Sequence, residues 1–453
     1  MDIKNNVLSN GMIIARLERL PLIRKLLTIR IVIGTSTFFD AYTILALAFA
    51  MPQLASEWNL STTMIGMIIS ASYVGQLFGA IFFGSLAEKI GRLGVLKITI
   101  ILFVLMDCAV LFAWSGTSML IIRFLQGLGI GSEVPVASAY INEFTGSKKR
   151  GKFFLLYEII FPIGLMFAGV MGYFLVPLYG WKILFIIGLI PSACMIPLRW
   201  YLPESPRWLA SKNRLNEADA VVTDLEKRAI KKGHILPEPI VTVFAEPKKS
   251  NWKELFQGIY RKRTFTIWCL WLSAYMINNG LITWLPTLYK QIFHLPLETA
   301  LSYGWVTSAV GVIASVICAL YIDKVGRKKW YSCAFILAII PFVTLFFLGA
   351  NNPIQVLIFG SMAYAILQTI TFSLYLYSSE IYPTRLRTIG TGMGSAWLRA
   401  GSSIGPLLVG SIVSFAGIQY VFLLFAAVAL FGGLITAIFA IETKGKVLEE
   451  LSP

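Results

Sequence analysis

Several charged residues lie inside apolar stretches of the sequence, where an ionisable side chain is costly and marks a functional site or a buried ion pair. Asp40 follows Phe38 and Phe39, and Glu133 lies in a glycine-rich run just before Pro135. A buried carboxylate at either place can exchange a proton near neutral pH. It can also serve only as a structural hydrogen-bond acceptor. Both acids are therefore candidate proton-coupling residues.

Arg399 is isolated between Gly394 and Ser403, with apolar sequence on both sides. A guanidinium at membrane depth with no acid nearby in sequence is suited to a bidentate contact with a substrate carboxylate. The alternative is an ion pair with a carboxylate of the protein itself, such as Asp40 or Glu133. We expect Arg399 to bind substrate.

Asp107 and Arg123 are two further charges within apolar segments. Arg123 lies ten residues before Glu133, about 15 Å along a helix, so these two cannot pair directly and each needs another partner. Asp107 is expected to be structural. The glycines after Arg123 allow a neighbouring helix to approach closely: Gly127, Gly129 and Gly131.

Aromatic and amide side chains recur at helical intervals and could line one face of a cavity. They are Trp271, Tyr275, Asn278 and Asn279, followed in a later segment by Gln368 and Tyr375. Amides buried in apolar surroundings need hydrogen-bond partners, so we expect them to contact substrate. No spacing of cysteine, histidine or acidic residues suggests a metal site, and no nucleophile–base pair suggests an enzyme.

The elements that must position these residues are long apolar helices. The chain has 453 residues, of which 57% are hydrophobic and 14% charged, against about 25% charged in ordinary soluble proteins. Twelve candidate spans are long enough to cross a bilayer: 27–52, 62–87, 94–114, 117–141, 153–177, 181–201, 264–288, 299–322, 330–349, 354–378, 388–415 and 418–441. The sequence predicts an all-α membrane protein with twelve transmembrane helices in two pseudo-symmetric six-helix bundles.

The charged segments between the spans define the organisation and orientation. The net charge is +16, and the basic residues form short clusters that fall on one side of the predicted spans, which places both termini in the cytoplasm. The same clustering argues against a nucleic-acid partner. The N-terminal segment 1–26 is predicted to be amphipathic and suited to an anionic leaflet. The predicted bundles are 27–201 and 264–441. They are joined by a cytoplasmic linker, 202–263, and followed by a cytoplasmic tail, 442–453.

One short turn occurs twice, from Gly84 to Arg92 and from Asp323 to Lys329. Each copy follows a long apolar segment and combines an acid, a glycine and basic residues. Such a repeat indicates that the two halves are related bundles. Transporters place their substrate sites at the interface between repeats.

Further motifs identify a family. Arg123-x-x-Gln-Gly, Pro203-Glu-Ser-Pro-Arg-Trp-Leu209, Glu380-Ile-Tyr-Pro-Thr-Arg385 and Glu442-Thr-Lys-Gly445, with the paired turns, resemble the major facilitator superfamily on its sugar-porter side. Phe39-Asp40-Ala, the run from Glu133 to Ser138 and Trp284-Leu-Pro286 resemble the bacterial niacin permeases, the metabolite:proton symporters and the organic-anion transporters. In that group an arginine in the eleventh span accompanies anionic substrates, and Arg399 occupies this place.

The resemblance implies gating charge networks on the cytoplasmic side that hold the outward-facing state. Their expected members are Glu88, Arg92, Glu143, Arg150, Asp323, Arg327, Glu380 and Arg385. One departure concerns coupling, because these relatives usually carry a second acid three residues after the first, where this chain has Thr43. Coupling would then fall to Asp40 or Glu133, or be absent.

The resulting expectation is a proton-coupled permease, working as a monomer by alternating access in the bacterial inner membrane. It would take up a small organic anion, niacin-like or another monocarboxylate, with H⁺ as coupling ion and no cofactor. The alternatives are a sugar or polyol porter and, from another class, a receptor or sensor that binds ligand without transporting it. Fold alone does not separate these substrates.

Overall fold

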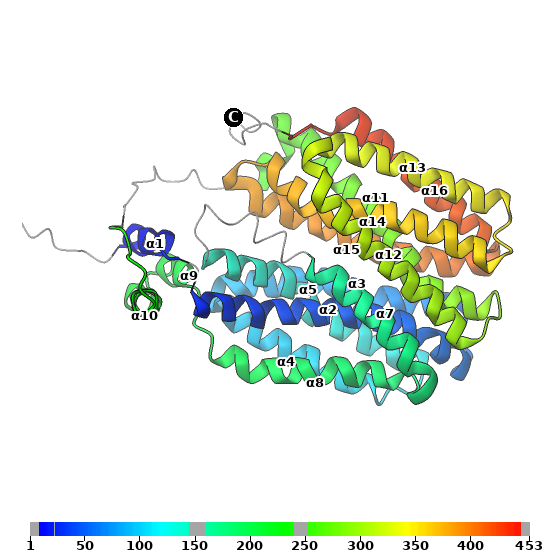
Figure 1. The fold of residues 1–453 in the computed structure, drawn as a ribbon, viewed down its shortest axis with the longest axis horizontal. Coiled ribbons are helices and arrows are strands. Elements are labelled where there is room, and N and C mark those ends of the chain that lie inside the picture. Colours follow the sequence, from blue (N-terminus) through cyan, green and yellow to red (C-terminus); the bar gives the residue numbers. More distant parts are fainter. Residues whose placement is uncertain (1–8, 22, 145–158, 240–251, 445–453) are drawn as a thin grey trace, which may run out of the picture.

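The computed structural model describes residues 9–21, 23–144, 159–239 and 252–444, and it is helical almost throughout (Figure 1). Within these residues twelve helices are long and apolar enough to cross a membrane. This confirms the predicted class of fold.

The spanning helices form two consecutive groups of six. The first group is α2 (Arg24–Glu57), α3 (Thr62–Ile90), α4 (Arg92–Val110), α5 (Gly116–Glu143), α7 (Ile160–Tyr179) and α8 (Lys182–Trp200). The second is α11 (Gly258–Gln291), α12 (Leu297–Val325), α13 (Arg327–Phe347), α14 (Pro353–Ile381), α15 (Thr384–Phe415) and α16 (Ile418–Phe439). Figure 1 shows each group as a bundle, the two lying side by side. Helices α2 and α11 begin before the predicted spans, because each continues into polar residues beyond its apolar stretch.

Three short helices lie together at one end of the first bundle (Figure 1): α1 (Asn10–Glu18), α9 (Pro206–Ser211) and α10 (Leu215–Ile230). We call this the linker end of the molecule. The helix α2 starts there, so the alternation of direction along the chain brings the starts of α3, α12 and α14 to the opposite end. A short 3₁₀ helix (Trp252–Phe256) precedes α11.

Helices α3 and α5 pack closely because both carry glycines four residues apart. A Cβ on Gly75 or Gly79 would lie 2.1 Å from a backbone carbonyl oxygen of α5. A Cβ on Gly127 or Gly131 would lie equally close to a carbonyl oxygen of α3. Small residues at this spacing let two helix backbones meet. The contact places α5, which carries Glu133, against α3.

The two bundles contact each other in the half opposite the linker end. Thr62 Oγ1 and Ser414 Oγ are 2.5 Å apart, and Ser70 Oγ donates to the Ser403 carbonyl oxygen at 2.6 Å. A Cβ on Gly304 would lie 3.1 Å from the ring of Phe49 across the same boundary. These contacts close the space between the bundles on that side.

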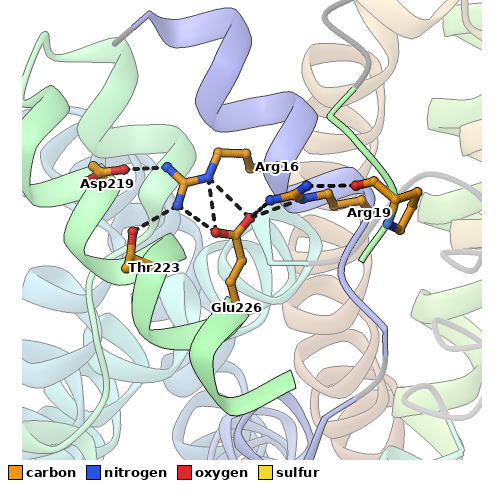
Figure 2. Close-up of polar contacts among 6 residues, drawn as sticks. Arg16, Arg19, Asp219, Thr223 and Glu226 are labelled. Atoms are coloured by element: carbon orange, nitrogen blue, oxygen red, sulfur yellow. Dashed lines mark hydrogen bonds and ion pairs between the residues drawn. The ribbon is translucent and has the colours of Figure 1, made fainter. Parts of the chain in front are cut away.

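The basic N-terminal segment contacts acids of the linker. Arg16 donates to Glu226, Asp219 and Thr223, and Arg19 donates to Glu226 at 2.6 Å (Figure 2). Burial alone would raise the pKa of the Glu226 carboxyl, but the hydrogen bonds from both arginines outweigh it and lower this pKa. These ion pairs join α1 to α10.

Candidate functional site: a cavity between the bundles

A cavity of about 990 Å³, part of it open to solvent, lies between the bundles about midway along their helices. The first bundle contributes Thr37, Asp40, Ile44, Tyr73, Gln76, Ile130, Phe161, Pro162 and Leu165. The second contributes Tyr275, Asn278, Asn279, Gln368, Thr371, Phe372, Tyr375, Leu398 and Arg399. This size and the mixture of aromatic, apolar and a few polar groups are typical of small-molecule sites.

Arg399 lies in the wall of this cavity and is only 4% exposed. Its Nη1 donates to the Ser395 carbonyl oxygen at 3.0 Å and to Ser395 Oγ at 3.2 Å. Its Nη2 donates across the bundle boundary to the Gly131 carbonyl oxygen at 2.7 Å, and its Nε has no hydrogen-bond partner. Within the described residues Arg399 makes no ion pair, so the alternative pairing with Asp40 or Glu133 is not formed in this structure.

The predicted amides line the cavity and are paired with other polar side chains. Asn278 Nδ2 donates to Gln368 Oε1 at 2.8 Å, and Asn279 Nδ2 donates to Ser402 Oγ at 2.6 Å. Asn278 Oδ1 is buried without a partner among the described residues. The amides therefore have fixed orientations, and Asn278 keeps an acceptor for a ligand.

The predicted aromatic residues form two layers. Tyr275 and Tyr375 line the cavity, whereas Trp271 lies behind them and is fully buried. The Trp271 ring stacks on Tyr275 with centroids 5.4 Å apart and meets Tyr375 edge-on at 4.6 Å, while its Nε1 donates to Ser378 Oγ. Trp271 thus supports the wall without being part of it.

Several wall residues were not predicted. Tyr73 and Gln76 are polar and lie three residues apart in an apolar segment, a signal that sequence reasoning could have used. Tyr73 OH and Gln76 Nε2 are buried with no hydrogen-bond partner in the described part of the chain. Phe161 and Leu165 carry no such signal, because apolar residues are ordinary in a spanning helix.

The two candidate proton-coupling acids have different surroundings. Asp40 lines the cavity, and its Oδ2 is buried with no hydrogen-bond partner among the described residues. Glu133 is not part of the cavity wall; it forms an ion pair with Arg199 of α8 and accepts from Thr99 Oγ1 at 3.3 Å. Arg199 is the partner that Glu133 was expected to need, and the sequence did not identify it.

Asp107 and Arg123 are joined through a glutamine. Gln126 Nε2 donates to Asp107 Oδ1 at 2.5 Å, and Arg123 Nη1 donates to Gln126 Oε1. All three side chains are buried. The arrangement ties α4 to α5 and agrees with the structural role expected of Asp107.

The repeated turn forms one charge network in each bundle, at the linker end. In the first, Arg92 pairs with Glu88 at 2.8 Å and with Glu143 at 3.1 Å. In the second, Arg327 pairs with Asp323 at 2.7 Å and with Glu380 at 2.8 Å. Among the described residues, each of these networks stays within its own bundle. Of the other expected members, Arg150 and the side chain of Arg385 lie outside the described residues.

A second contact is repeated beside each network: a carboxylate that accepts from a backbone N–H. Glu204, after α8, accepts from the Leu93 backbone N–H at 3.1 Å, and Glu442, after α16, accepts from the Arg327 backbone N–H at 2.9 Å. Each carboxylate thereby caps the helix that follows the repeated turn.

Two such bundles around a central cavity define a transporter of the major facilitator superfamily. The family model described as "Sugar (and other) transporter" matches residues 30–453, and the chain belongs to this family. It is therefore a multi-pass membrane transporter and not an enzyme.

The relatives are transporters of different substrates. The chain is 28% identical over 440 residues to the niacin transporter NiaP of Acinetobacter baylyi, covering 97% of this chain and 99% of that protein. It is 30% identical over 386 residues to the benzoate transport protein of the same species, covering 83% and 81%. The partially occluded inward-open structure of the xylose transporter XylE from E. coli matches with a TM-score of 0.72 at 18% identity, covering 94% of this chain and 100% of that one. The last likeness shows the fold alone, whereas the bacterial transporters agree with the expected inner-membrane location.

Proposed function

We propose that this protein takes up a small organic anion, niacin-like or another monocarboxylate, together with a proton. The observation that carries the proposal is Arg399, a buried guanidinium in the cavity wall whose bonds go to the neutral acceptors of Ser395 and Gly131. A buried charge needs a counter-charge. A carboxylate in the cavity would supply it through charge-assisted hydrogen bonds.

The remainder of the wall suits a ring or short apolar body with one or two polar atoms. Phe161, Leu165 and Phe372 offer apolar contact. Tyr73 and Asn278 each hold a buried polar atom without a partner among the described residues. The niacin and benzoate transporters among the relatives bear the names of aromatic monocarboxylates, which supports this substrate class.

Asp40 is the better proton carrier of the two candidates, because it lies in the wall where water and substrate have access. Glu133 is already bound by Arg199 outside the wall. A proton on Asp40 would remove the cost of its buried charge while the site is closed. The coupling needs no cofactor.

We place the linker end in the cytoplasm. Arg92, Lys97 and Lys324 lie at or near helix ends there, as the positive-inside rule requires of cytoplasmic residues. The contacts between Thr62 and Ser414 would then close the outer side, as in the inward-facing state of alternating access. The cavity is built within one chain, so a monomer can carry out transport.

The test is uptake of radiolabelled nicotinate and benzoate into proteoliposomes. Arg399→Ala should reduce uptake by about 100-fold, the loss expected for a bidentate charge-assisted contact, while Arg399→Lys should retain part of it. Thermal unfolding of both purified variants controls for folding. Unchanged uptake in a folded Arg399→Ala protein would refute the anion assignment.

Coupling is tested in the same vesicles. An inward proton gradient should drive accumulation by the natural protein, and Asp40→Asn should keep substrate exchange but lose accumulation. An Asp40→Asn protein that still concentrates nicotinate would exclude Asp40 as the carrier.

The second candidate function is a sugar or polyol porter. Its support is the pair of amides, Asn278 with Gln368, and the hydroxyl of Ser402 beside Asn279, since neutral polar groups are what sugar hydroxyls bind. Excess xylose or glucose should leave nicotinate uptake unchanged if the anion proposal is right, whereas benzoate should compete.

A further inference from the structure

The guanidinium of Arg199 contacts three other helices of the first bundle. Nη2 donates to Ser36 Oγ of α2 at 2.5 Å and to Glu133 Oε1 of α5, and Nη1 lies 3.3 Å from Glu133 Oε2. Nη1 also donates to the Leu96 carbonyl oxygen of α4. Arg199 has no exposed surface, and its Nε is without a hydrogen-bond partner in the described residues. The charge is therefore held wholly inside the first bundle.

Ser36 and Asp40 lie one helical turn apart on α2 and so share a face. The Ser36 hydroxyl that accepts from Arg199 therefore belongs to a residue about 6 Å along the helix axis from Asp40. The charges that act on Asp40 include those of both Glu133 and Arg199. The charge of one arginine thus acts on two buried acids, binding Glu133 directly and lying near Asp40 through Ser36.

The other groups around Asp40 do not replace this counter-charge. Asp107 of α4 adds a further negative charge, and α7 presents only apolar or proline side chains to the cavity. The remaining titratable groups in the cavity wall come from α3, α11, α14 and α15: Tyr73, Tyr275, Tyr375 and Arg399. Arg399 makes its hydrogen bonds with Ser395 and Gly131, not with Asp40.

We propose that Arg199 is the positioning residue of proton coupling, dividing one positive charge between Glu133 and Asp40 and so deciding when Asp40 takes up and releases its proton. This rests on the proposed proton-coupled function. In the present arrangement Glu133 holds Arg199, and a neutral Asp40 leaves the three side chains with zero net charge. An ionised Asp40 would leave a net charge of −1 in a buried place, which is costly.

The proton step changes only O–H bonds. A hydronium ion in the cavity gives a proton to a carboxylate oxygen of Asp40 and becomes water, and on the other side a water molecule takes the proton back and becomes hydronium. Release becomes favourable when the guanidinium of Arg199 moves toward Asp40 and Glu133 gives up its share of the charge.

The experiment is an infrared titration of the protonated carboxyl band in purified, detergent-solubilised full-length protein, with Asp40→Asn identifying the band. Glu133→Gln removes a competing negative charge, so the midpoint should move by about one pH unit to lower pH. Arg199→Gln should move it by a similar amount to higher pH. Arg199→Lys should keep the natural midpoint, and Glu133→Gln with Arg199→Gln should restore it approximately, because both charges are removed together.

Opposite shifts of the midpoint in the two single variants, with recovery in the double variant, would support the proposal. Loss of an ion pair with only a structural role predicts lower stability and no opposite shifts of the midpoint. An unmoved midpoint, or shifts in the same direction, would overturn it. If Arg199→Gln does not fold, Glu133→Gln and Ser36→Ala carry the test: Ser36→Ala frees the guanidinium to approach Asp40 and should lower the midpoint. The titration needs no substrate, so its result is independent of nicotinate uptake, the measurement that tests the proposed function.

Discussion

At the scale of residues, the second layer of the cavity wall decides how the first layer is oriented. Trp271 does not line the cavity, but its ring contacts both Tyr275 and Tyr375, and its Nε1 donates a hydrogen bond to Ser378 Oγ. A large buried ring with a satisfied N–H contributes packing and also fixes its neighbours. It therefore packs behind the two tyrosines and is not among the residues that line the cavity.

Trp271→Ala should lower the free energy of unfolding by about 3–5 kcal/mol, because it leaves a cavity where a buried indole was. Trp271→Phe keeps a ring against both tyrosines and should cost less, with nicotinate uptake largely retained. Thermal unfolding of the purified variants and uptake in proteoliposomes measure both effects. Equal losses of stability in the two variants would show that the ring contacts do not matter.

At the scale of elements, the repeated turn has the same local structure in both bundles. Gly91 and Gly326 have φ of +100° and +97°, and each is followed by a helix whose first N–H groups face a carboxylate. A Cβ on Gly91 would lie 2.2 Å from Glu204 Oε2, and one on Gly326 would lie 2.5 Å from Glu442 Oε2. Glycine is required at both places for its backbone conformation and for space.

Gly91→Ala and Gly326→Ala should each destabilise the protein by about 1–3 kcal/mol through strain at positive φ and displacement of the capping carboxylate. Gly84→Ala is the matched control, because Gly84 is helical and a Cβ there meets nothing within 4 Å. Thermal unfolding should distinguish Gly91→Ala and Gly326→Ala from the control. A Gly91→Ala protein as stable as Gly84→Ala would contradict this account of the repeated turn.

At the scale of the whole molecule, transport by alternating access requires the bundles to separate where they now touch. Thr62 and Ser414 lie at that boundary, at the end opposite the linker helices. The charge networks of Arg92 and Arg327 lie at the linker end, and their ion pairs within the described part of the chain join residues of the same bundle. The closed side is therefore held by contacts between helices, among them α3 with α15, and not by these networks.

A Thr62→Cys and Ser414→Cys pair, in a background in which the five native cysteines are replaced, should cross-link on oxidation and stop nicotinate uptake. Reduction should restore uptake, and each single-cysteine variant should be unaffected by oxidant. The cross-linked fraction is read from gel mobility after cleavage in the linker. Full uptake by fully cross-linked protein would show that this boundary does not open.

The sequence alone determined the class of fold and much of the cavity, because apolar length and helical spacing are local properties. Arg399, Asn278, Gln368 and Tyr375 were found as polar residues in apolar segments, and the structure brings them together in one cavity. Glu88, Arg92 and Glu143 were found through a motif, and the first network joins them.

Only the tertiary structure decided which buried charges meet. Arg199 lies 66 residues from Glu133 and 163 from Ser36, so no spacing in the sequence could pair them. The same holds for Arg16 and Glu226, whose contact depends on how the linker helices fold back on the N-terminal helix. A charge in an apolar segment shows that a partner is needed, but its identity depends on distances that exist only after the helices have packed.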